Sequence, residues 1–148
     1  GFGTMGFGLG AAMGAKVGNP DKVVVHCTGD GCFRMNCHEL ATEEYYNIPV
    51  ITVIFDNRTL GMVRQWQNLI YDKRFSQTDL DRGPDFVKLA QAYGLHGFRA
   101  ANQAEFAEAF RQALELGTGC VIDCAIDIDA MVHPMVNGGT PVTDFLLD

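Results

Sequence analysis

The sequence predicts an α/β fold, an open and mainly parallel sheet flanked by helices. Two short apolar runs rich in β-branched residues, 23–28 and 50–55, have the pattern of parallel strands buried on both faces. A segment with helical signals lies between them, and further strand and helix patterns alternate downstream. Strands that alternate with helices favour a parallel sheet with right-handed crossovers.

The first part of the chain is expected to contain two helices. Residues 1–17 are rich in glycine and predict a loop that leads into a helix carrying Leu9 and Met13, with its backbone unusually close to a neighbour. After the first strand, Asn36 and Glu39 have the spacing of an N-cap and its capping box. This spacing predicts a helix that begins at Asn36.

The second part is expected to add two helices and two strands. Asp85 can begin a helix that Gly94 ends, and a short strand over 97–100 follows. An amphipathic helix that ends near Gly117 comes next, and a last strand occupies 120–126. No periodicity is visible after these elements, so the remaining residues, 132–148, are expected to form an irregular tail.

Length and composition limit the classes of function. The 148 residues suffice for one domain, and 47% hydrophobic with 20% charged residues is the composition of an ordinary globular core. No apolar run approaches the roughly 18 residues that a membrane span needs. The net charge is −7 and lysine and arginine are not clustered, so neither a membrane nor a nucleic acid is expected as a partner.

The cysteines and the start of the chain indicate its context. Five cysteines are an odd number in a chain large enough to fold without disulfides, which favours a reducing compartment. The chain starts at Gly1 in a stretch that is already apolar and glycine-rich. We therefore expect residues 1–148 to be a single domain and a fragment of a longer protein.

The strongest candidate site joins Gly29-Asp30-Gly31 to Asn57. Both follow the carboxyl end of a predicted strand within one strand-helix-strand unit, where open α/β sheets bind ligands. The glycines allow a phosphate to approach the backbone, and the oxygens of Asp30, of Asn57 and of a nearby carbonyl suit magnesium. By itself, however, a Gly-Asp-Gly triplet is more often an ordinary turn.

Two other motifs invite different interpretations. Gly1, Gly3 and Gly6 match the dinucleotide fingerprint, but no strand precedes them and no acidic residue ends the next strand. A group of cysteines and histidines could suggest zinc or an iron–sulfur centre, but its spacing matches no common site. Strand alternation also points His26 and Cys27 to opposite faces, so satisfied or surface residues are the better interpretation.

Several segments together resemble one enzyme family. The stretch from Gly29-Asp30-Gly31 to Asn57 resembles the thiamine diphosphate motif. Over nearly the whole chain the sequence is similar to the carboxyl-terminal, diphosphate-binding domain of the acetolactate synthase (acetohydroxyacid synthase) large catalytic subunit. Other segments also carry this resemblance. They are Gly3-Thr4-Met5-Gly6-Phe7-Gly8, Asn47-Ile48-Pro49-Val50, Leu60-Gly61-Met62-Val63-Arg64-Gln65-Trp66-Gln67, Tyr71-Asp72-Lys73-Arg74-Phe75, Asp85-Phe86-Val87-Lys88-Leu89-Ala90 and His133-Pro134-Met135-Val136.

The resemblance implies a reaction for the whole enzyme. Members of this family use thiamine diphosphate and magnesium to condense pyruvate with a second pyruvate or with 2-oxobutyrate, with loss of carbon dioxide, and their products lead to branched-chain amino acids. The activating glutamate comes from the pyrimidine-binding domain of a neighbouring subunit, and FAD from a middle domain. We therefore expect no catalytic residue and no FAD on this chain, and no activity of the chain alone.

The resemblance also implies roles for individual residues. Asp30 and Asn57 would bind magnesium through their side chains and Thr59 through its backbone carbonyl. Gly31 and Cys32 would contact the diphosphate, although the family usually has serine or alanine at the position of Cys32, which leaves the effect on affinity open.

Residues outside the diphosphate loop are implied as well. Met5 would meet the aminopyrimidine through its backbone, and Met62 would lie under the cofactor. Trp66 would line the pocket of the second oxo acid and favour 2-oxobutyrate. By spacing alone, Met62, Trp66 and Leu69 form a stripe more typical of a core than of a cofactor wall. The other residues expected at the cofactor are Gly3, Gly29 and Gly61.

Partners and alternatives complete the expectations. The resemblance implies 2-oxo acid substrates, a homo-oligomer, a pyrimidine-binding domain and room for a regulatory subunit, in a bacterial cytoplasm or an organelle. One alternative is another thiamine diphosphate-dependent decarboxylase or carboligase, from which Gln65-Trp66-Gln67 separates this family. The other is a non-catalytic, stand-alone cofactor-binding domain.

Overall fold

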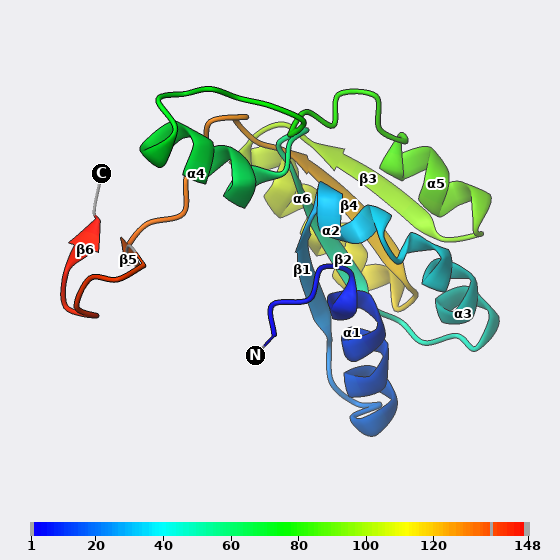
Figure 1. Cartoon of the computed structure of the whole chain (residues 1–148). Coiled ribbons are helices and arrows are strands. Elements are labelled where there is room, and N and C mark those ends of the chain that lie inside the picture. Colours follow the sequence, from blue (N-terminus) through cyan, green and yellow to red (C-terminus); the bar gives the residue numbers. More distant parts are fainter. Residues whose placement is uncertain (1, 137, 147–148) are drawn as a thin grey trace.

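A four-stranded parallel sheet forms the centre of the computed structural model, which describes residues 2–136 and 138–146 (Figure 1). The spatial order of its strands is β1-β2-β4-β3, and all three pairings are parallel. This confirms the predicted fold class. Because the strands are parallel, all their carboxyl ends lie at one edge. The strands are β1 (Val25–Gly29), β2 (Ile51–Asp56), β3 (His96–Ala100) and β4 (Cys120–Ala125).

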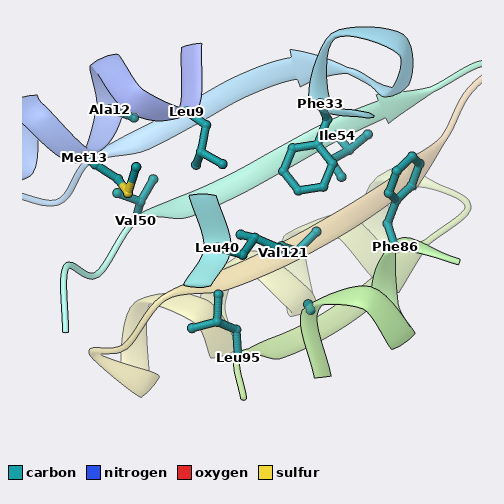
Figure 2. Packing of buried hydrophobic residues seen from close by; sticks show 11 residues of the cluster. Leu9, Ala12, Met13, Phe33, Leu40, Val50, Ile54, Phe86, Leu95 and Val121 are labelled. Carbon is teal, nitrogen blue, oxygen red and sulfur yellow. The ribbon is translucent and has the colours of Figure 1, made fainter. Parts of the chain in front are cut away.

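Helices cover the two faces of this sheet unequally. A core cluster joins one face to α1, α2, α3 and α5, and Figure 2 shows its side chains. A second cluster joins the other face to α6. On that second face α6 does not reach the whole of β1 and β2, so Val25 and Phe55 stay about two-fifths exposed. The helices are α1 (Phe7–Gly18), α2 (Asp30–Arg34), α3 (Leu40–Tyr45), α4 (Gly61–Ile70), α5 (Phe86–Ala92) and α6 (Gln103–Leu116).

The close approach expected of the glycine-rich start occurs at Gly8. A Cβ atom at this position would collide with the imidazole ring of His26 on β1. His26 is buried, and its Nδ1 lies 3.4 Å from the hydroxyl of Thr52 on β2. Gly8 therefore allows α1 to lie directly on the sheet.

The segment between β1 and β2 differs from the prediction of one helix that begins at Asn36. Helix α2 starts directly after β1, and a 3₁₀ turn, Cys37–Glu39, separates it from α3. The Asn36 side chain makes no capping hydrogen bond. The expected capping box is missing because Glu39 Oε2 accepts a hydrogen bond from Thr42 Oγ1 at 2.8 Å.

The boundaries of α5 and α6 follow the predicted signals. Asp85 Oδ1 accepts hydrogen bonds from the backbone N–H groups of Val87 and Lys88, at 3.1 and 3.2 Å, and so caps α5. Gly117, at φ 65°, takes the left-handed conformation after the end of α6.

The carboxyl-terminal segment contains one feature that the sequence did not predict. Within the expected irregular tail, β5 (Met135–Val136) pairs with β6 (Phe145–Leu146) in an antiparallel ladder. Strands of two residues are too short to produce a periodic pattern. Gly1 of the dinucleotide-like motif and residues 137, 147 and 148 of the tail lie outside the described residues.

The described helices also bear on the membrane question. Within residues 2–136 and 138–146, no helix has the length and apolar character required to cross a bilayer.

Candidate functional site

A cavity of about 460 Å³ lies at the carboxyl edge of the sheet, beyond the ends of β1, β2 and β4. Ligands of open α/β sheets bind at this edge. Nine of the residues expected at the cofactor line the cavity, although they come from three separate parts of the sequence. They are Met5, Gly29, Asp30, Gly31, Cys32, Asn57, Thr59, Gly61 and Met62.

Asp30 provides the acidic group of the cavity. It is the first residue of α2, and only 1% of it is exposed. Its Oδ2 is buried and has no hydrogen-bond partner within the described part of the chain, and Arg34 Nη2 lies 3.9 Å away. Burial, together with the nearby Asp56 carboxylate, raises the pKa of Asp30 to about 6. A cation beside this carboxylate would offset the cost of burying it.

Gly31 brings α2 close to the opposite wall. A Cβ atom at Gly31 would lie 2.9 Å from Leu60 Cδ2 and 3.2 Å from Leu80 Cδ1. Any larger residue would therefore push these two leucines away from the loop. The close packing holds the 29–31 loop against the segment that follows β2.

Asn57 and Thr59 follow the end of β2 in a tight turn. Asn57 Oδ1 accepts a hydrogen bond from the Thr59 N–H at 3.2 Å, and Arg58 between them has a left-handed φ of 57°. The hydroxyl of Thr59 donates to the Thr78 carbonyl at 2.9 Å. A Cβ at Gly61 would lie 2.8 Å from Asn57 Nδ2, so glycine allows α4 to begin beside the turn.

The chemistry of these groups fits a magnesium ion with a diphosphate. The Asp30 carboxylate, the Asn57 amide and the Thr59 carbonyl are hard oxygen donors, and all three residues line one cavity. Asp30 Oδ2, which lacks a hydrogen-bond partner among the described residues, leaves a lone pair available for a metal.

Helix α4 presents apolar side chains outside the core. Met62 is 48% exposed and lines the cavity, while Gln65 is only 3% exposed. Interpreting the stripe of Met62, Trp66 and Leu69 as a core face is therefore wrong, since Leu69 is also exposed. Two of the predicted site residues, Gly3 and Trp66, are not among the described residues that line the cavity. Trp66 is half-buried on α4.

The sequence did not identify the remaining wall of the cavity. The position of Ile126, directly after β4, could have signalled it, because parallel strands end at the same edge. Gln65 belongs to a segment that carries the family resemblance, but a buried glutamine in a helix has no pattern that marks it as part of a cavity wall. These further lining residues are Phe55, Leu60, Val63, Gln65, Ile126, Ala130, Met131 and Val132.

The cysteine and histidine side chains do not form a second centre. His26 is buried against α1 whereas Cys27 is exposed on the opposite face of the sheet. No group of three or more histidine, cysteine, aspartate or glutamate residues able to hold a metal occurs in the part of the chain that the structure describes. The site at Asp30 is not a group of this kind, because only one of its three oxygen donors belongs to a carboxylate and the other two belong to an amide and a backbone carbonyl.

Comparison with known proteins shows the family of the chain. Residues 1–124 match the family model described as "Thiamine pyrophosphate enzyme, C-terminal TPP binding domain". The chain belongs to this family. Its fold is similar to the thiamine diphosphate-dependent 4-hydroxybenzoylformate decarboxylase of Rhodococcus jostii RHA1, with a TM-score of 0.78 and 34% identity. That comparison covers 84% of this chain and 24% of the other.

The sequence is also similar to acetolactate synthase large subunits. It is 48% identical over 146 residues to a probable large subunit of Methanococcus aeolicus, and 44% identical over 143 residues to the isozyme 3 large subunit of Escherichia coli K12. These alignments include 99% and 94% of this chain but 24% and 25% of the relatives. The thiamine diphosphate-binding chain described here thus spans about a quarter of the length of these relatives.

Proposed function

We propose that this chain supplies the diphosphate and magnesium site of an enzyme that condenses pyruvate with pyruvate or 2-oxobutyrate to form acetohydroxy acids. The observation that carries the proposal is that Asp30, Gly31, Asn57 and Thr59 line one cavity. All four lie within the residues that match the cofactor-binding family model, which supports the proposal. The similarity to acetolactate synthase large subunits supports the choice of reaction.

Each group at the polar end of the cavity has a distinct role in this proposal. Asp30 and Asn57 bind magnesium through side-chain oxygens and Thr59 through its carbonyl, while Gly31 and Cys32 lie against the diphosphate. When bound, thiamine diphosphate would supply a thiazolium ring that takes up the electron pair released by decarboxylation. The magnesium in turn neutralises charge at the acidic edge of the domain.

The apolar end of the cavity has a complementary role. Met5, Phe55, Met62 and Met131 offer an apolar surface to the rings of the cofactor. Such a surface excludes water from the reacting atoms and strengthens polar interactions beside them.

Other parts of the enzyme complete the proposal. The activating glutamate would come from a pyrimidine-binding domain of a neighbouring subunit in a homo-oligomer, and FAD would bind outside this chain. A regulatory subunit and a cytoplasmic or organellar compartment fit the same enzyme. The coverage of only a quarter of the relatives supports the assignment of these functions to other segments.

A chimera tests the proposed reaction. This chain would replace the matching region of the Escherichia coli relative, and acetolactate would be measured after addition of pyruvate, thiamine diphosphate and magnesium. We expect acetolactate formation that Asp30→Ala lowers at least about a hundredfold. A folded chimera that binds the cofactor and makes only the aldehyde would contradict the carboligase and support a decarboxylase, which the Rhodococcus neighbour represents.

The role of Trp66 has its own test in the same chimera. We expect Trp66→Leu to lower the preference for 2-oxobutyrate over pyruvate, measured as the product ratio when both oxo acids compete. Leucine retains an apolar side chain but removes the large ring. An unchanged ratio would contradict the assignment of Trp66 to the second substrate.

A further inference from the structure

The segment after β4 returns to the cofactor cavity and is held there by α4. Figure 1 shows α4 beyond the edge of the sheet, with a long loop between it and α5. Ile126, Met131 and Val132 line the cavity together with Met62 and Val63 of α4. The position of residues 126–132 relative to α4 therefore determines the shape of the apolar end of the cavity.

One buried side chain makes the central connection. Gln65 Oε1 accepts a hydrogen bond from the Val132 N–H at 2.8 Å, and Gln65 Nε2 donates to the Val132 carbonyl at 3.0 Å. The Nε2 group also contacts the sulfur of Met135 at 3.0 Å. The amide of Gln65 thus pairs with the backbone of Val132 as another strand would, and only 3% of Gln65 is exposed.

A second connection nearby is weaker. Arg64 forms an ion pair with Asp129 at 2.7 Å, but 69% of the Asp129 side chain is exposed to solvent. Exposed ion pairs contribute little because water and salt screen them. The buried amide pairing of Gln65 is therefore the stronger of the two. If Gln65 is removed, the backbone groups of Val132 lose their partner at a site where little water can replace it, which is costly.

From these contacts we propose that Gln65 is a positioning residue that fixes residues 126–132 as a preset apolar wall for the rings of the cofactor. The inference rests on the proposed function and deepens it. The polar groups that suit the diphosphate come from the ends of β1 and β2, whereas Ile126, Ala130 and Met131 add only apolar side chains to the cavity. Gln65 therefore acts on the part of thiamine diphosphate that inorganic pyrophosphate lacks.

The same helix provides a matched control. Gln67 makes an equivalent pair of bonds with Ser76, in which Nε2 donates to the carbonyl and Oε1 accepts from the N–H, each at 3.1 Å. Neither Gln67 nor Ser76 lines the cavity. Gln65→Met and Gln67→Met therefore remove equivalent bonds from α4, but only the first should affect the cofactor.

The test compares these two variants with the unmutated chain in three measurements. NMR hydrogen exchange follows the Val132 amide, and calorimetry gives the affinity for thiamine diphosphate and for pyrophosphate, both with magnesium. For Gln65→Met we expect faster exchange at Val132, about tenfold weaker thiamine diphosphate binding, and pyrophosphate binding within about twofold. Gln67→Met is expected to leave all three values unchanged.

Three outcomes would overturn the inference. Thiamine diphosphate affinity within about twofold of the unmutated chain would show that the wall does not depend on Gln65. An equal loss of pyrophosphate affinity would indicate general damage to the site. Failure of the unmutated chain to bind thiamine diphosphate would contradict the proposed function itself, and with it this inference.

Discussion

Glu43 is a buried carboxyl group with little compensation for its charge. Only 1% of it is exposed; Oε1 accepts from the Val50 N–H at 3.3 Å, and Oε2 has no partner among the described residues. Burial raises the pKa of Glu43 to about 8, although the bond from Val50 opposes the shift. The same burial and the nearby Glu43 raise the pKa of Cys120 to about 12.

This raised pKa predicts how stability depends on pH. The folded state retains the Glu43 proton more tightly than the unfolded state, whose pKa is near 4.5. Its stability is therefore fully present below about pH 4.5 and falls as the pH rises through about 8. The free energy of unfolding of the unmutated chain should therefore be lower at pH 8 than at pH 5 by a few kcal/mol, on the order expected for such a shift in pKa. Glu43→Gln should remove this difference.

Urea unfolding at the two pH values measures the effect of Glu43. Glu44→Gln is the control, because Glu44 is the exposed neighbour on the same helix. If Glu43→Gln keeps the pH dependence of the unmutated chain, the buried carboxyl is not the source of it.

The site residues were predictable to the extent that they follow strand ends. Asp30 and Asn57 come directly after β1 and β2, so their meeting at one edge follows from a parallel sheet. Gly61 and Met62 could be predicted as cavity residues only from the family resemblance. Val132 could not be predicted, because its contact with Gln65 joins a backbone group to an amide 67 positions away, without any pattern in either segment.

Helix α1 gives a matched pair of tests at the scale of an element. Gly8 and Gly14 both lie within it, but a Cβ at Gly8 would collide with His26, whereas nothing lies within 4 Å of a Cβ at Gly14. We expect Gly8→Ala to lower the free energy of unfolding by about 1–3 kcal/mol through overpacking. Gly14→Ala should raise it by about 0.5–1 kcal/mol through helix propensity.

Thermal or urea unfolding of the two variants checks this prediction. The signs of the two changes are the decisive result, since the same substitution is made in the same helix. A stabilising Gly8→Ala would show that α1 does not lie against His26 as closely as the structure places it.

The predictions for α5 and α6 were correct because their signals are local, whereas the predicted capping box and the predicted buried face of α4 were wrong. Asp85 and Gly117 mark the ends of α5 and α6 by chemistry contained in a few residues. Glu39 did not join a capping box, because its carboxylate bonds Thr42. On α4 the apolar stripe indicated a core, yet Met62 lines the cavity and Leu69 is exposed, because the core lies under other helices.

At the scale of the whole molecule, the exposed apolar surface predicts self-association. Phe2, Phe7 and Ile70 are 103%, 70% and 53% exposed. Side chains of this kind favour contact with another surface. Sedimentation velocity should therefore give a mass above the 16.2 kDa of one chain that rises with concentration up to about 100 µM.

Two substitutions separate specific association from general stickiness. Phe7→Ser with Ile70→Ser should lower the mass toward that of one chain. Leu114→Ser serves as the control, since Leu114 is 47% exposed on α6. A monomer at every concentration, or an equal effect of the control, would contradict the prediction.

The central claim is that the loop after β1 holds the diphosphate of thiamine diphosphate through magnesium. The most direct measurement is a calorimetric titration of thiamine diphosphate, with and without magnesium, into the unmutated chain, Asp30→Ala and the control Asp81→Ala, whose exposed carboxylate lies outside the cavity. We predict magnesium-dependent binding that Asp30→Ala abolishes and Asp81→Ala retains. Binding that is independent of magnesium, or unchanged in Asp30→Ala, would contradict the claim.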